Sequence, residues 1–145
     1  MPEPLPKTPR AQGSYVPAIV HGGLAVSAGM TPRVDGRLVV HGVVGTDLDI
    51  EAAQAAAALA ARNALAAIVS AAGGLDRIER CLRLSVFVAC ADGFHDLTAV
   101  ADGASAALAE YVGADALPVR SAIGVRSLPS GAPVEVELTV AIRSA

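Results

Sequence analysis

The stretch PVRSAIGVRSLPSGAPVEVELTV, residues 118–140, indicates how the chain folds, because it holds two strand patterns separated by a turn. In its last part, VEVELTV, apolar residues alternate with polar ones, as in a strand with one buried and one exposed face. The LPSG segment is typical of a turn. We therefore predict strands at about 119–127 and 133–142, joined as a hairpin by a four-residue loop at 128–131.

This hairpin would place charges of both signs on one face of the sheet. Arg120 and Arg126 are an even number of residues apart and share a face, as do Glu135 and Glu137. A four-residue loop puts the arginines on the glutamates' side, with Arg120 opposite Thr139. Two interpretations stay open. The charges form a solvated or interface ion-pair network, or an arginine grips a ligand carboxylate beside a glutamate that transfers a proton.

Outward from this stretch, strand and helix patterns follow one another. The segment CLRLSVFVAC, residues 81–90, alternates as a strand does, and an Ala-rich run predicts a long helix before it. The other predicted strands are at 15–20, 24–28 and 37–40. The order β-β-β-α-β-α-β-β predicts an α+β fold, in which one mixed sheet carries both helices on one face.

The ends of the two helices are marked by capping residues. Asp47 or Asp49 can cap the first helix, and Gly73-Gly74 ends it. Apolar residues recur at helical spacing from 94 to 111, with Asp92 as the predicted cap and Gly113 as the predicted stop.

The chain is 145 residues long, which suits one domain. Residues 1–13, MPEPLPKTPRAQG, lack the apolar core of a signal peptide, so we expect a mobile leader followed by a single domain over 14–145. The apolar fraction is 53%, but much of it is alanine and there is no tryptophan. Because alanine buries little area per residue, we expect a homo-oligomer.

The charge and the aromatic content argue against two classes of partner. The net charge is −3 and aromatic residues make up 3% of the chain, whereas nucleic-acid binders usually show a basic face or stacking aromatics. We therefore expect no nucleic-acid partner. No uncharged apolar run of 18 residues occurs, so we also expect no membrane span.

The cysteines and histidines give no sign of a metal site or a disulfide. Cys81 and Cys90 fall in one predicted strand, about 30 Å apart when extended, and could not pair. Both are expected to be packing residues in a reducing cytoplasm. His21, His41 and His95 share no metal-ligand spacing with one another or with the cysteines.

Three segments of the chain carry a family resemblance. These are VRSAIGVRSLPSGAPVEVEL, YVPAIVHGGLAVSAGMTP and GVVGTDLDIEAAQAAAALAARNALAAI. The first is similar to an Arg-Ser, Leu-Pro, Glu-x-Glu pattern, and the second to a Tyr followed by Ser-Gly-Gln and a Pro. From about Tyr15 to Ile142 the chain resembles the RidA/YjgF/UK114 family, in particular a longer subgroup of it. The resemblance implies a homotrimer with a chorismate-mutase-like fold.

The resemblance also implies a function. Family members hydrolyse reactive enamines and imines to 2-oxo acids and ammonia, with neither a metal nor an organic cofactor. The arginine that holds the substrate carboxylate matches Arg120, and the glutamate that orients water matches Glu135. Tyr15 and Gly29 match pocket residues. The ligand would be a small carboxylate-bearing metabolite, bound between neighbouring chains.

This sequence departs from the family pattern at several matched positions. Met30 follows Ala28-Gly29 where the active branch has Ser-Gly-Gln, Asp102 matches an asparagine, and Ala122 matches a frequent cysteine. An alternative is therefore a non-catalytic, carboxylate-binding or regulatory trimer of the same fold. Ribonuclease activity, which the superfamily's name suggests, fits the acidic composition less well.

Overall fold

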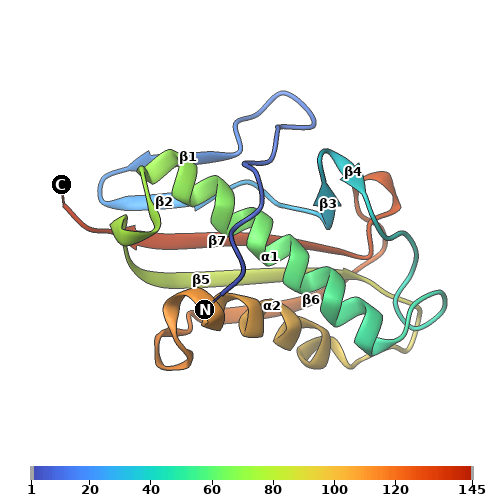
Figure 1. The fold of residues 1–145 in the computed structure, drawn as a ribbon. Helices are drawn as coiled ribbons and strands as arrows, with labels where there is room; N and C mark the ends of the chain where they lie inside the picture. The colour runs from blue at the N-terminus through green and yellow to red at the C-terminus, as the bar shows by residue number, and fades with distance from the viewer. Residues whose placement is uncertain (1, 145) are drawn as a thin grey trace.

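A mixed sheet and two helices form the two layers of the fold (Figure 1). The structure is a computed structural model that describes residues 2–144. The sheet has five strands in the order β1-β2-β7-β5-β6: β1 Ala18–His21, β2 Leu24–Ser27, β7 Val134–Ile142, β5 Ile78–Ala89 and β6 Val119–Val125. The helices are α1 Ile50–Ala72 and α2 Leu97–Val112. A separate hairpin consists of β3 Arg33–Val34 and β4 Arg37–Leu38, and short 3-10 helices occupy Leu75–Arg77, Ala114–Ala116 and Pro129–Gly131.

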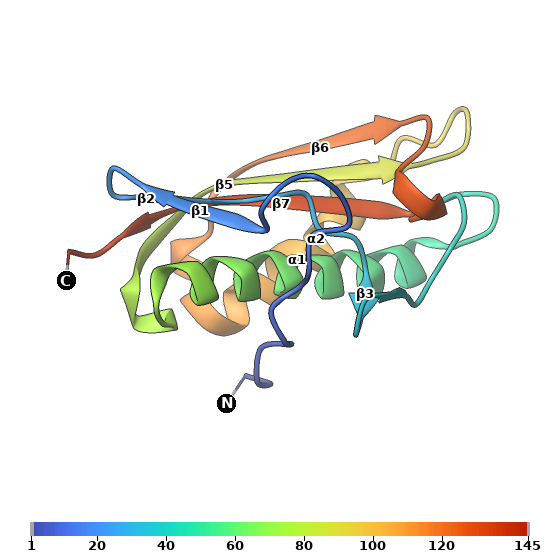
Figure 2. The same cartoon turned by 90° about the horizontal axis from the view of Figure 1, so that it is seen from above.

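Both helices cover the same face of the sheet, as Figure 2 shows from above. The alternation predicted for the last strand is observed: Val134, Val136 and Leu138 are buried under the helices, whereas Glu137 between them is exposed. The α+β fold with one mixed sheet and two helices on one face is therefore confirmed.

The opposite face of the sheet carries no helix from residues 2–144 (Figure 2). By strand register, this open face displays apolar side chains that are 41–63% exposed: Ile19, Leu24, Val26, Val119 and Ile123. They form two groups, one on β1 and β2 and one on β6, and the strands between them carry Thr139 and Arg83 on this face. Exposed apolar groups of this kind are typical of a surface that another chain covers.

The alanines of α1 allow the two helices to approach closely. Buried alanines line α1 on the sides facing the sheet and α2. On α2, a Cβ added to Gly103 would lie 2.2 Å from the Gln54 carbonyl oxygen. The side chain of Gln54 also donates to the Ala99 carbonyl at 2.7 Å. A glycine at this crossing is therefore a steric requirement of the packing.

The predicted ends of α1 are confirmed, and the predicted start of α2 is wrong. Asp49 caps α1 by accepting from the Ala52 N–H at 2.8 Å, and Gly73 ends the helix with a φ of 101°. The second helix begins at Leu97, after Asp96, and not after Asp92. Gly93, with a φ of 80°, makes a turn there that delays the helix. Gly113 ends α2 as predicted.

The predicted hairpin between the last two strands is wrong. Strand β6 pairs in parallel with β5, with Arg120 beside Leu84, and β7 pairs with the other edge of β5, with Glu137 beside Ser85. The reason is the β5-α2-β6 crossover, since a strand that follows a covering helix joins its predecessor in parallel. Arg120 is therefore not opposite Thr139.

Two further expectations can be compared with the fold. Of the strand predicted at 37–40, only Arg37–Leu38 forms, and it pairs with Arg33–Val34 outside the main sheet. Within residues 2–144, α1 alone is long and apolar enough to cross a membrane. Since most of its apolar length is buried inside the fold, α1 has the burial of a core helix.

Candidate functional site

Arg120 lies on the edge strand β6, and its side chain turns toward α2. Its Nη1 donates to Asp102 Oδ1 at 2.8 Å and to Ser105 Oγ at 2.9 Å. Nε and Nη2 donate to no group within residues 2–144, and neither is sealed from solvent. One edge of the guanidinium is therefore held by the protein, and the other remains available to a ligand. We call Arg120, Asp102 and Ser105 the arginine cluster.

Local structure accounts for the arginine cluster. Asp102 and Ser105 are three residues apart on α2 and so share a face of the helix. This face lies beside the edge of the sheet, where β6 carries Arg120 and, two residues on, the partly buried Ala122. The Arg120 side chain is 20% exposed and that of Asp102 is 61% exposed. Arg120 is thus partly desolvated, which strengthens its charged contacts.

Glu135 lies on β7, beside the segment that follows β2. Met30 and Val136 exchange two backbone hydrogen bonds, of 2.7 and 2.8 Å, and these hold Gly29 next to Glu135. A Cβ on Gly29 would lie 2.7 Å from Glu135 Cδ, so the carboxyl rests against a backbone that has no side chain. Tyr15 lines a cleft together with Gly29 and Met30. We call Glu135, Gly29, Met30 and Tyr15 the glutamate cluster.

The environment of Glu135 favours the protonated acid. Burial raises the pKa of Glu135, and the neighbouring Glu137 raises this pKa further. Within residues 2–144, no lysine or arginine forms an ion pair with Glu135. A carboxylate with a raised pKa and no ion-pair partner is a stronger base than an exposed one.

A cleft of about 640 Å³ has Tyr15, Gly29 and Met30 in its wall, whereas Glu135 does not line it. The leader residues 6–10 form one side, and the turn at Arg33–Gly36 forms another. The leader is held by Leu5, which packs on the core, and crosses α1 in Figure 1. A volume of this size lies within the range of about 300–1,000 Å³ that is usual for small-molecule sites.

Asn63 anchors the floor of this cleft. It lies on α1, is 3% exposed, and donates through Nδ2 to the carbonyls of Thr31 and Arg33 at 3.1 and 3.0 Å. Arg33 is fixed in turn by side-chain donation to Thr31, Gly36 and Ser130. The polar floor is therefore rigid.

Within one chain the structure does not bring the two clusters together. Glu135 pairs with Phe87 and faces the open side of the sheet, whereas Arg120 points to the helix side. Strand β5 lies between their strands. The predicted residues thus form two separate groups, Arg120 with Asp102 and Ala122, and Glu135 with Gly29, Met30 and Tyr15.

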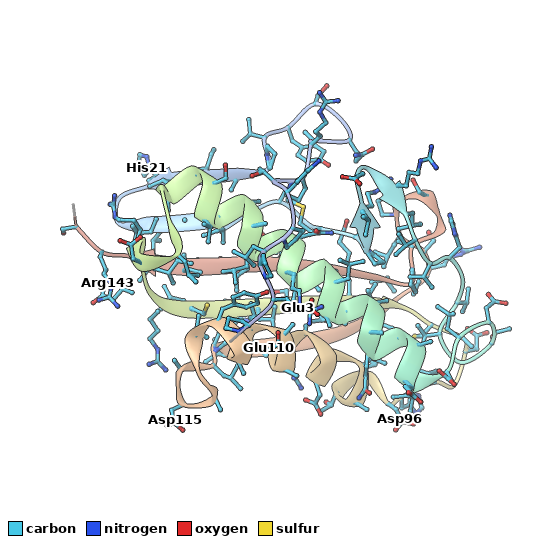
Figure 3. All side chains as sticks on the ribbon, viewed as in Figure 1. Glu3, His21, Asp96, Glu110, Asp115 and Arg143 are labelled. Atoms are coloured by element: carbon cyan, nitrogen blue, oxygen red, sulfur yellow. The ribbon has the colours of Figure 1, made fainter. Side chains whose placement is uncertain are left out.

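Other charged groups stay apart from both clusters. Asp96, Asp115 and Arg143 are exposed and project from the rim of the domain in Figure 3. His21, at the end of β1, is also exposed at the rim. These side chains show no arrangement that suggests a second ionic centre.

Sequence reasoning missed two polar residues of the site. Ser105 shares Arg120 Nη1 with Asp102, and its place three residues after Asp102 was the available signal. Asn63 is an amide within an Ala-rich helix, and a polar side chain in such a run is itself a sign of a specific buried contact.

Comparison with known proteins shows the family to which the chain belongs. A family profile described as Endoribonuclease L-PSP matches residues 5–142. Protein TCP17 of Trypanosoma cruzi is 33% identical over 144 residues, which cover 97% of this chain and 88% of TCP17.

Solved structures share the fold. The protein Atu1372 of Agrobacterium tumefaciens, described as having unknown function, is 37% identical with a TM-score of 0.87, over 92% of this chain and 86% of Atu1372. TdcF of E. coli, solved with bound serine, is 25% identical with a TM-score of 0.68, over 95% of this chain and 94% of TdcF. The matched profile, the fold and these relatives place the chain in the endoribonuclease L-PSP family, that is, the RidA/YjgF family.

Proposed function

We propose that the chain hydrolyses reactive 2-imino and enamine acids to 2-oxo acids and ammonia, with no metal or organic cofactor. The observation that carries the proposal is that the two clusters offer side chains with complementary chemical roles. Arg120 offers one unpaired edge of its guanidinium, and Glu135 has a raised pKa and no ion-pair partner within residues 2–144. The first group suits a ligand carboxylate, and the second suits proton transfer from water.

The proposed site is shared between copies of the chain. Arg120 lies on the edge strand β6, and Glu135 lies two strands away on the open face. A head-to-tail contact between copies can bring the arginine cluster of one chain to the glutamate cluster of the next, and such contacts close into a ring. The exposed apolar residues of the open face support burial in this ring. We propose a homotrimer, as the family resemblance implies.

In the proposed reaction the protein mainly positions the substrate and the attacking water. Arg120 holds the carboxylate, and Glu135 accepts a proton from water as the water oxygen bonds to the imine carbon. From the iminium form this addition gives a neutral carbinolamine. Glu135 returns the proton to its nitrogen, the C–N bond breaks as the carbonyl forms, and the hydroxyl proton passes to the ammonia, which leaves as ammonium. An enamine enters the same route after protonation at carbon. One imine and one water thus give one 2-oxo acid and one ammonia.

The relatives and the cleft support a small carboxylate as ligand. The TdcF structure contains serine, a small molecule with a carboxylate. The cleft beside Tyr15, Gly29 and Met30 could receive the ligand's side chain.

A second candidate is a carboxylate-binding protein without turnover. It is favoured by one observation, the 2.8 Å contact that already occupies one nitrogen of Arg120 with Asp102. Ribonuclease activity is not proposed, because a net charge of −3 and few aromatics suit RNA poorly.

Hydrolysis of freshly generated 2-iminopropanoate and 2-iminobutanoate tests the proposal. We expect the protein to accelerate both reactions, and Arg120→Ala to lower kcat/KM by roughly 10- to 100-fold, because a charged hydrogen-bond pair is lost. Arg126→Ala is the matched control, since Arg126 is exposed and outside both clusters. A folded oligomer that accelerates neither reaction would exclude the hydrolase and leave the binding protein.

A further inference from the structure

The ion pair between Arg120 and Asp102 leaves polar atoms on both residues without a hydrogen-bond partner among residues 2–144. Asp102 Oδ1 accepts from Arg120 Nη1, while Asp102 Oδ2 accepts no hydrogen bond from residues 2–144. The Asp102 side chain is 61% exposed, and within the described residues its one ion pair is with Arg120. The Nε and Nη2 edge of Arg120 and the Oδ2 of Asp102 are therefore both available within the same ion pair.

We infer that Asp102 makes this site select zwitterionic ligands, in which a positive nitrogen is adjacent to a carboxylate, over 2-oxo acids of the same length. This inference rests on the proposed role of Arg120 as the carboxylate holder. The ligand carboxylate takes the Nε and Nη2 edge of Arg120, and the ligand nitrogen faces Asp102.

The physical reason is the net charge of the pair. An isolated arginine attracts any carboxylate, but Asp102 at 2.8 Å cancels much of that attraction for an anion. A zwitterion recovers the lost interaction, because its positive nitrogen is attracted to Asp102. The iminium form of an imino acid is such a zwitterion, whereas the 2-oxo acid product is an anion. Asp102 would thus favour the substrate over the product and assist product release.

Ser105 and Asp102 contribute differently to the cluster. Both accept from Nη1, at 2.9 and 2.8 Å, so both position Arg120. Asp102 alone adds charge. Asp102→Asn keeps an acceptor of the same shape and removes the charge, so this variant separates selection by charge from positioning.

Calorimetric titration with non-reacting ligand pairs tests the inference. The probes are L-alanine against 2-oxopropanoate, and L-2-aminobutanoate against 2-oxobutanoate, at fixed pH and salt. The wild type is expected to bind the amino acid of each pair more tightly. Asp102→Asn is expected to shift the affinity ratio toward the oxo acid by at least about tenfold. Ser105→Ala should weaken both ligands alike, and Glu110→Gln, on the same helix but paired with Arg62, should change neither.

These binding measurements test the inference independently of whether the protein hydrolyses imines. A ratio that shifts in Asp102→Asn supports the inference even if no imine is hydrolysed. A ratio that stays the same in Asp102→Asn overturns it and leaves Asp102 as a positioning residue only. Failure of the wild type to bind any of the four probes also overturns it. Circular dichroism of each variant confirms the fold, which an exposed Asp102 is not expected to control.

Discussion

Arg120 and Glu135 leave the sheet on opposite faces, and strand β5 separates the strands that carry them. Within one chain they cannot act on the same small ligand. Any reaction that uses both residues must therefore take them from different copies of the chain. An activity that needs both residues therefore depends on how copies of the chain assemble.

Mixed oligomers test this relationship directly. Arg120→Ala and Glu135→Gln are each expected to be inactive alone, yet to regain activity when co-assembled. In a ring of three with head-to-tail contacts, a mixed ring has about one intact site in three. The measurement is imine hydrolysis by co-expressed, differently tagged chains purified through both tags.

The control for co-assembly is a chain with both substitutions, mixed with Arg120→Ala. Such mixed rings contain no intact arginine and should stay inactive. Doubly tagged oligomers of Arg120→Ala and Glu135→Gln that show no recovery would contradict a site shared in this way.

Glu135 is expected to control the pH dependence of the reaction. Because burial and Glu137 raise the pKa of Glu135, the rate should rise with pH through that raised value, as the carboxylate forms. The pH profile of kcat/KM measures this. Glu137→Gln removes one of the two causes and should shift the profile to lower pH. An unchanged profile would show that another group limits the rate.

The same raised pKa predicts the effect of Glu135 on stability. Protonated Glu135 contributes stability that is fully present below its unfolded pKa and is lost as pH rises through its folded pKa. Glu135→Gln resembles the protonated acid at every pH. It should therefore be more stable than the wild type at neutral pH, and this gain should shrink on acidification. Urea unfolding at several pH values measures it, and a gain that grows on acidification would refute it.

Gly29→Ala tests the close contact with Glu135. The new methyl group would lie 2.7 Å from Glu135 Cδ and 3.0 Å from Cγ, so the carboxyl must move. We expect a loss of about 1–3 kcal/mol in the free energy of unfolding, together with loss of turnover.

A double-mutant cycle shows whether that loss arises at Glu135. In a Glu135→Ala background the contact is absent, so Gly29→Ala should cost less than about 0.5 kcal/mol. Equal costs in both backgrounds would place the strain elsewhere, for example in the backbone of Gly29.

The helices and the buried strand faces could be predicted from the sequence because they depend on local patterns. Asp49 and Gly73 mark the ends of α1, and the alternation of residues 134–142 gives the buried face of β7. Strand pairing could not be predicted in this way. The partner of β6 is decided by the α2 crossover, and the alternation of residues within β6 does not indicate whether β5 or β7 is its neighbour.

The candidate site was predictable in part for the same reason. Arg120, Asp102 and Glu135 were identified by their match to a family pattern, but their distribution over two faces follows from the strand order. The one signal for Ser105 is its place three residues after Asp102, and this signal is weak because a serine on a helix is usually solvated. Asn63 is marked in the sequence as an amide within an Ala-rich run, but only the structure shows that its Nδ2 holds the carbonyls of Thr31 and Arg33.

Gly103→Ala tests the packing of the two helices on which the arginine cluster depends. Helix propensity favours alanine over glycine by about 1 kcal/mol, so this substitution would stabilise an isolated helix. In the structure, however, the methyl group would lie 2.2 Å from the Gln54 carbonyl oxygen, and a backbone atom has little room to move. Since overpacking costs about 1–3 kcal/mol or more, we expect urea unfolding to show a net loss of stability.

Ala106→Gly, at an exposed position of α2, is the control and should lower the free energy of unfolding only by the difference in helix propensity, about 1 kcal/mol. If Gly103→Ala instead raised stability, the helices would have to lie further apart than the structure places them.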